Sequence, residues 1–239
     1  QNWASNVNLA VEDNDNGLVS TDEYLGVFYP SGFTSDNFGN NIVVPSSHMM
    51  LRTIALSDQV SFPWFAPAGT RRGGITNASS TGYISNEGEF VSTALNEGQR
   101  DTLYSNNVNP ITFITGAGLV NYGQKTRFAG SSALDRINVA RLVIYMRSQL
   151  NKLARPYVFE PNDKITRDEI KAQAESLLLE LVGNRAIYDF LVVCDESNNT
   201  PTRIDRNELY LDIAIEPVKA VEFIYVPLRL KNTGEIAGL

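Results

Sequence analysis

The clearest alternation of apolar and polar positions lies in the second half of the chain. Residues 137–150 place apolar side chains near a 3.6-residue spacing, which predicts an amphipathic helix ended by Pro156. A second helix is expected to start at a capping box of Thr166 and Glu169 and to end at Gly183. Three stretches with strand character follow this helix, at 186–194, 208–216 and 220–230.

The first half of the chain predicts shorter elements separated by polar segments. Strands are expected at 23–28, 111–115, 119–122 and, buried, at 157–159. Helices are expected over 48–55, entered at Pro45 or Ser46, and over 89–105. The aromatic and proline-rich stretch 62–69 predicts a buried extended crossing, whereas 77–87 has the composition of an exposed loop.

This order of elements predicts an α/β (α+β) fold in two layers, a mixed β-sheet packed by helices. We expect a lead-in segment at 1–22 from an upstream domain, an α/β domain over 23–219 and a C-terminal strand or arm at 220–239. A terminal strand of this kind either closes its own sheet or is lent to a neighbour. The predicted intermolecular strand comprises Val221, Glu222, Phe223, Ile224, Tyr225 and Val226.

Composition excludes several classes of protein. The chain is 43% hydrophobic and 20% charged, which is ordinary for a globular protein. Its net charge of −7 opposes nucleic-acid binding, and no apolar run approaches the roughly 18 residues of a membrane span. Cys194 is the one cysteine, so an internal disulfide framework is impossible, and we expect its side chain in the core. Because the chain begins with Gln1, it is expected to be processed or cut from a longer protein.

One stretch near the N-terminus has the spacing of a calcium-binding loop. Glu12, Asn14, Asn16 and Glu23 fall on positions that supply oxygen ligands in an EF-hand. The first position is Glu rather than Asp, and a strand rather than a helix is predicted to follow. These departures favour an Asn/Asp-rich surface loop, with calcium as the weaker alternative and no other metal or cofactor expected.

Candidate catalytic groups are sparse. Asp195, Glu196 and Asp205 surround a turn and provide the carboxylates for a metal-dependent hydrolase, but the same composition is typical of a structural turn. His48 is the only histidine, and a partly buried structural role is expected for it. We therefore do not expect an enzyme.

A basic stripe follows the predicted helix after Ser132. Arg136, Arg141, Arg147 and Lys152 lie on its polar side, in a protein of net negative charge. A solvated helix face is one interpretation. The other is a docking face for an acidic protein partner, because complementary charge sets register and encounter rate.

Several short motifs, taken together and in order, resemble the tail sheath protein family of contractile bacteriophage tails and related injection machines. The weaker matches Tyr29-Pro30 and 44–47 (Val-Pro-Ser-Ser) precede the others. The main motifs are 63–69 (Pro-Trp-Phe-Ala-Pro-Ala-Gly), 101–110 (Asp-Thr-Leu-Tyr-Ser-Asn-Asn-Val-Asn-Pro), 122–126 (Tyr-Gly-Gln-Lys-Thr), 134–142 (Leu-Asp-Arg-Ile-Asn-Val-Ala-Arg-Leu), 159–162 (Phe-Glu-Pro-Asn) and 193–201 (Val-Cys-Asp-Glu-Ser-Asn-Asn-Thr-Pro).

The resemblance implies a structural part of the virion tail rather than a catalyst. It implies the C-terminal portion of a subunit that polymerises helically, in six-fold rings, around a tail tube and contracts to drive that tube through the host envelope. The implied partners are further copies of the chain, the tail tube protein, the baseplate and the tail terminator, with no nucleic acid and no membrane insertion. The resemblance further implies assembly in the host cytoplasm, followed by residence in the virion tail.

The chain also departs from the family pattern. Ala140 replaces the first of two adjacent arginines, which leaves Arg141 as the match. We expect Arg136, Arg141 and Arg147 to face the tube or a neighbouring subunit. Another tail or baseplate component that shares this domain is the alternative within the same structural class.

Overall fold

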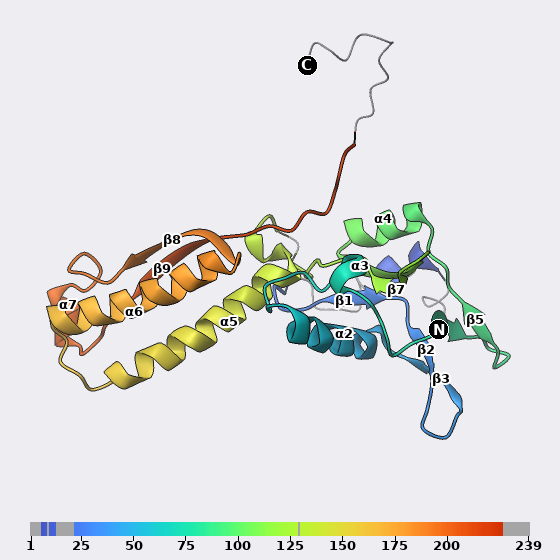
Figure 1. Cartoon of the computed structure of the whole chain (residues 1–239), viewed down its shortest axis with the longest axis horizontal. Helices are drawn as coiled ribbons and strands as arrows, with labels where there is room; N and C mark the ends of the chain where they lie inside the picture. The colour runs from blue at the N-terminus through green and yellow to red at the C-terminus, as the bar shows by residue number, and fades with distance from the viewer. Residues whose placement is uncertain (1–5, 9, 13–21, 129, 227–239) are drawn as a thin grey trace, which may run out of the picture.

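The computed structural model describes residues 6–8, 10–12, 22–128 and 130–226 of the 239-residue chain. The molecule is elongated and has two lobes (Figure 1). We call the lobe that contains β1 to β7 and α2 to α4 the sheet lobe, and the lobe that contains α5, α6, α7, β8 and β9 the helical lobe. None of the helices within these residues is both long and apolar enough to cross a membrane.

The sheet lobe contains two small sheets. In the first, of order β1-β6-β7, β1 (Val27–Tyr29) runs parallel to β6 (Val108–Ile114), which pairs antiparallel with β7 (Gly118–Asn121). The second is antiparallel, of order β3-β2-β4-β5. Its strands are β2 (Gly32–Ser35), β3 (Asn41–Val44), β4 (Ser80–Ile84) and β5 (Phe90–Ser92). The helices of this lobe are α2 (Ser46–Val60), α3 (Gly69–Arg72) and α4 (Glu97–Ser105).

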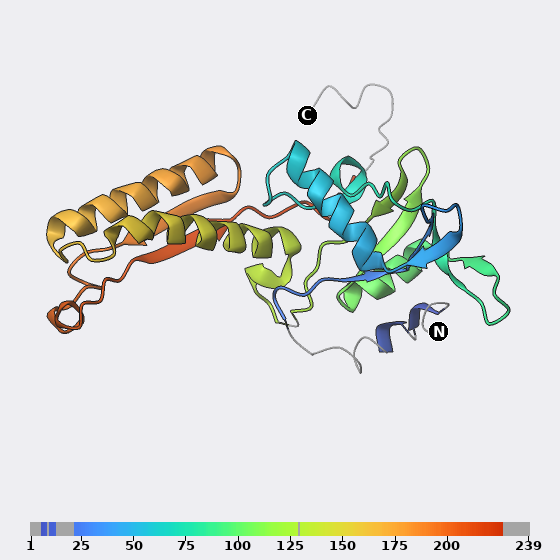
Figure 2. The ribbon, with the colours of Figure 1, turned by 90° about the horizontal axis from the view of Figure 1, so that it is seen from below.

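The helical lobe is a helix pair on a two-stranded sheet (Figures 1 and 2). A 3-10 turn, η2 (Ala133–Asp135), leads into α5 (Ile137–Ala154), and a second, η3 (Arg155–Tyr157), leaves it. Then come α6 (Lys164–Gly183), β8 (Ile187–Val193), α7 (Pro201–Asp205) and β9 (Asp212–Pro217). The mixed α/β class predicted from the sequence is confirmed, although the strands of the described residues divide among three small sheets rather than one.

The core of the helical lobe is built by one face of each element. Leu142 and Met146 of α5 meet Leu178 of α6 and Ile187 of β8. Trp64, from the loop after α2, is buried in the same cluster, stacks on Phe62 at 4.6 Å between ring centroids, and donates from Nε1 to the Asn184 carbonyl at 3.0 Å. The aromatic crossing predicted at 62–69 is therefore buried at Trp64, although it turns rather than runs extended. It fastens the sheet lobe to the helical lobe.

The predicted loop at 77–87 and the helix start at 89 are wrong, because this region contains the β4–β5 hairpin. The small and polar residues of this region suggested a loop, but one of them is required by close packing between the two strands. A Cβ on Gly82 of β4 would lie 2.2 Å from the Val91 carbonyl oxygen of β5, so a small residue is needed there. The helix begins only after Asn96, whose side chain forms a capping box with Gln99.

The remaining corrections concern exposure and capping. The predicted buried strand at 157–159 is a turn whose Phe159 is 101% exposed and has φ of +77°. The predicted partly buried His48 is exposed. The cap of α6 is Asp163, which accepts from the Thr166 amide at 2.9 Å, so the predicted Thr166–Glu169 box lies one turn too late. Buried Cys194 agrees with its predicted place in the core, and burial raises the pKa of its thiol.

The contact between α6 and the sheet generates the first prediction. Leu178→Ala removes a fully buried side chain and is expected to lower the free energy of unfolding by about 2–5 kcal/mol, from lost transfer energy and an unfilled cavity. Leu179→Ala is the matched control, since Leu179 is 62% exposed on the same helix. Urea unfolding of both variants tests this, and equal losses would show that α6 packs through a different face.

Candidate functional site

The two-stranded sheet of the helical lobe is covered on one face and unpaired at both outer edges. β8 and β9 pair antiparallel, with Phe190 opposite Ile215, and within the described ranges no third strand joins them. α6 packs against β8, yet Tyr188 and Leu191 on β8 are 64% and 61% exposed. Outer edges with unpaired backbone donors and acceptors are ready positions for another strand.

The loop that joins β8 to β9 is held rigidly by two buried asparagines. Asn198 Nδ2 donates to the carbonyls of Val193 and Tyr210, and Asn199 accepts the Tyr210 amide at 2.7 Å. These bonds fix the ends of β8 and β9 beside each other. The two edges are therefore presented by a rigid hairpin.

The carboxylates predicted for a hydrolase take structural positions in this loop. Asp195 accepts the Ser197 amide at 2.8 Å, and hydrogen bonds from the Ser197 side chain and amide lower the pKa of that carboxyl. Glu196 and Asp205 are both exposed. Among the residues that the structure describes, no three His, Cys, Asp or Glu side chains come together in a way that suits a metal ion.

The structure describes only two of the four residues predicted to bind calcium. Glu12 and Glu23 belong to the described residues, whereas Asn14 and Asn16 lie outside them. The proposed ligand set therefore stays a prediction from the sequence.

After β9 the chain crosses from the helical lobe to the sheet lobe and then leaves the body (Figure 1). We call residues 218–226 the C-terminal segment. Its first residue is tied at both backbone groups, because the Val218 amide donates to the Ala186 carbonyl at 3.0 Å and the Val218 carbonyl accepts from Asn138 Nδ2 at 3.5 Å. Residues 220–226 of the predicted strand 220–230 form no strand within the chain, and 227–230 lie outside the described part.

The C-terminal segment combines exposed apolar side chains with one largely buried carboxylate. Its exposed apolar side chains are Val221 at 78%, Phe223 at 66%, Ile224 at 79%, Tyr225 at 87% and Val226 at 80%. The Glu222 side chain, in the middle of this run, is only 16% exposed. The segment is therefore attached through Val218 and Glu222, and residues 223–226 expose apolar side chains that no other described part of the chain covers.

Glu222 is bound by donors from the junction of the two lobes. Arg136, the N-cap residue of α5, donates from Nε to Oε1 at 2.7 Å and from Nη2 to Oε2 at 3.1 Å, a bidentate arrangement. Gln124 Nε2, in a residue only 3% exposed, donates to Oε1 at 3.0 Å. The Tyr104 hydroxyl also faces the carboxylate and helps to lower the pKa of Glu222. We call these four residues the Glu222 anchor.

The electrostatics of the anchor favour an ionised carboxylate. Burial opposes the charge of Glu222, but the hydrogen bonds from Arg136 and Gln124 outweigh it and hold the pKa of that carboxyl below its ordinary value. Burial likewise disfavours charged Arg136, yet its bond to Glu222 leaves the pKa raised. Burial, followed by the nearby Glu222 charge, raises the pKa of Tyr104, which stays a neutral donor.

The three arginines predicted to dock the tube or a neighbour have different surroundings. Arg136 binds Glu222 and Asp135, and Arg141 pairs with Asp58 of α2, so both have partners within the chain. Arg147 is exposed on α5. Docking by these residues stays a prediction, and Arg147 is the one whose side chain is most available for it.

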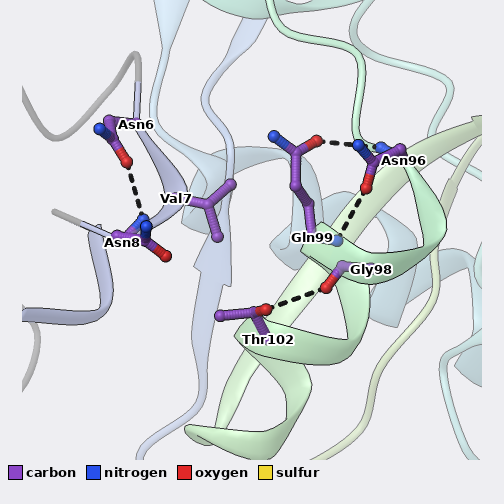
Figure 3. Close-up of a pocket in the computed structure, with 7 residues that line it drawn as sticks. All are labelled: Asn6, Val7, Asn8, Asn96, Gly98, Gln99 and Thr102. Carbon is purple, nitrogen blue, oxygen red and sulfur yellow. Dashed lines mark hydrogen bonds between the residues drawn. The ribbon is translucent and has the colours of Figure 1, made fainter.

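Two hollows accompany these features. A groove of about 560 Å³ lies between the C-terminal segment and the start of α5. Two buried acceptors in its lining, Gln124 Oε1 and Asn138 Oδ1, have no hydrogen-bond partner among the residues that the structure describes. The other, of about 620 Å³, lies between the N-terminal residues and α4 (Figure 3). Its polar lining is already occupied, because Asn96 and Gln99 bond each other in the capping box and Thr102 bonds the Gly98 carbonyl.

Comparison with known proteins gives consistent relatives. Residues 130–231 match the family described as phage tail sheath C-terminal domain. The chain is 35% identical over 247 residues to the tail sheath protein of Vibrio phage KVP40, covering 100% of this chain and 35% of that protein. It is 32% identical over 233 residues to the tail sheath protein of Enterobacteria phage T4, covering 94% and 33%. The chain thus spans about a third of the length of the curated relatives it matches.

Solved structures share the fold. The sheath complex of an extracellular contractile injection system, PVC, in its contracted state gives a TM-score of 0.77 at 19% identity, covering 95% of this chain and 61% of that one. The contracted helical sheath of the anti-feeding prophage gives 0.75 at 20% identity, covering 89% and 57%. A chain of the anti-feeding prophage baseplate gives 0.74 at 19% identity, covering 90% and 56%.

The anchor generates a prediction about pH. The pKa of Glu222 is lower in the folded chain than its ordinary value of 4.5. The ionised carboxylate therefore stabilises the folded chain fully above pH 4.5, and this stabilisation is lost as the pH falls through the lower pKa of the folded chain. The ¹H–¹⁵N signal of Arg136 Nε–H is expected to change with a midpoint below 4.5. Glu222→Gln is the control, in which the step due to Glu222 disappears and only the response to the neighbouring Asp135 can remain. A midpoint of the Glu222 step at or above 4.5 would contradict the anchor.

Proposed function

Because this chain belongs to the phage tail sheath protein family, we propose that it is part of a contractile sheath subunit that polymerises helically around a tail tube. On contraction, the sheath drives that tube through the host envelope. The observation that carries this proposal is the pairing of two complementary features in one chain. Among the residues that the structure describes, the β8–β9 sheet has no further strand at either outer edge, and the C-terminal segment is an apolar run that pairs with no strand.

These features suit strand addition between identical copies. The C-terminal segment of one copy would pair along an edge of the β8–β9 sheet in the next. About five new backbone hydrogen bonds, at roughly 1 kcal/mol each, would hold such a junction. A donor surface and an acceptor surface on different parts of one chain make a head-to-tail contact, and such contacts generate helices when they do not close.

Contraction then requires that these junctions persist while larger surfaces rearrange. A strand junction is separate from the packing surfaces between the bodies that it joins, so it can persist while those surfaces rearrange. The stored free energy would lie in the packing between rigid bodies, released when one arrangement gives way to another. We infer a structural rather than catalytic role, with the tail tube, baseplate and tail terminator as partners and Arg147 of α5 as a candidate contact. Location in the virion tail, after assembly in the host cytoplasm, belongs to the same proposal.

A baseplate component is the second candidate, favoured by the similarity of fold to a chain of the anti-feeding prophage baseplate. Symmetry distinguishes the two functions. A sheath subunit polymerises without a fixed length, whereas a baseplate component closes into a ring. Electron microscopy of the assembled protein therefore separates them.

The strand-addition proposal predicts a contrast between two substitutions at one exposed position. Ile224→Pro removes a backbone donor and is expected to prevent the full subunit that carries this sequence from forming tubes. Ile224→Thr keeps both the donor and a β-branched side chain, so tubes are expected to persist. Negative-stain electron microscopy is the measurement. Normal tubes from the proline variant would contradict pairing of this segment.

A further inference from the structure

We propose that the Glu222 anchor steers the C-terminal segment away from its own β8–β9 sheet and so keeps the strand available for another copy. The last step of this inference, the availability for another copy, rests on the proposed function. The steering itself concerns a single chain. It addresses a competition that the topology creates, since the nearest open edge to the segment belongs to its own subunit.

Self-pairing is sterically simple for this chain. β9 ends at Pro217, and hairpin loops commonly have two to five residues, so residues 218–222 have the length of such a loop. A strand beginning at Phe223 would then run back beside β9. Folding back would also cover the exposed apolar side chains of 223–226, so the hydrophobic effect favours it. A specific interaction is needed to oppose it.

The C-terminal segment is instead held at both ends of the stretch that would have to turn. At one end the Val218 amide bonds the Ala186 carbonyl at 3.0 Å, and its carbonyl accepts from Asn138. At the other end Glu222 is bound by Arg136 and Gln124. A stretch fixed at both ends along the direction that leads away from β9 (Figure 1) cannot form a hairpin loop.

The anchor is built to take a carboxylate at this one position. Its three partners are all donors, and they come from separate parts of the chain: Tyr104 from α4, Gln124 from the stretch after β7, and Arg136 from the N-cap of α5. Arg136 is itself positioned by Asp135 at 2.9 Å. Glu222 is the only acidic residue in the run 217–226, so no other residue of the segment offers an equivalent carboxylate.

The test is a distance measurement within one chain. Spin labels on Ala214→Cys in β9 and Tyr225→Cys in the C-terminal segment report whether the two lie side by side, and both native side chains are exposed. Cys194 is buried, and a sample without added cysteines checks that it is unlabelled. Pulsed electron spin resonance is recorded with an excess of unlabelled chain, so that only distances within a molecule contribute.

The steering role predicts a specific set of distances. With Glu222 present, one long distance is expected. Glu222→Gln and Glu222→Arg are expected to raise the population at the spacing of neighbouring strands at least tenfold. The double variant Glu222→Arg with Arg136→Glu, which exchanges the charges, is expected to restore the long distance. Glu216→Gln is the matched control, since it removes an exposed acid from β9 and should change nothing.

Other results overturn the inference. A short distance with Glu222 intact would show that the anchor does not prevent self-pairing. A distribution that only broadens in Glu222→Gln would show that the anchor orders the segment without steering it. Because no assembly is needed, this outcome is independent of the tube assay with Ile224→Pro. The distance measurement can therefore contradict the steering role without contradicting strand addition, and the tube assay can contradict strand addition without contradicting the steering role.

Discussion

The architecture depends on the β8–β9 sheet, which has only two strands among the described residues, so backbone donors and acceptors at its outer edges are left unpaired there. Two strands alone are marginally stable in water, and β8 and β9 persist because α6 and the core around Leu178 cover one face. The same arrangement leaves both outer edges unpaired within the described part of the chain. A two-stranded sheet that is stable within its own chain and has unpaired edges can accept strands from other copies.

The junction between the lobes determines how the C-terminal segment is positioned. Within about one turn, the start of α5 presents Arg136 to Glu222 and Asn138 to the Val218 carbonyl. Asn138 also donates to the Trp64 carbonyl at 3.5 Å, while the Trp64 indole bonds Asn184 across the lobe boundary. The exit direction of the C-terminal segment is thus mechanically coupled to the contact between the lobes.

Prediction from the sequence succeeded where the pattern was local and long. The helices α5 and α6 and the strands β6, β7 and β8 lie close to their predicted positions, because each buries one face at a regular spacing. It failed at β4, where small residues such as Gly82 are required by a close neighbour rather than by a loop. It failed again at Phe159, where an apolar residue is fully exposed, contrary to the usual rule.

The pattern of residues was sufficient to predict the main helices, the family resemblance and an apolar terminal run interrupted by one acid. The role of that acid became visible only in the packed fold, where Glu222 binds Arg136 and Gln124. Glu222 and Arg136 are 86 positions apart, and no periodicity or spacing connects residues at such a distance. Local patterns record which face of an element is buried, whereas a contact between distant segments exists only after those elements have packed.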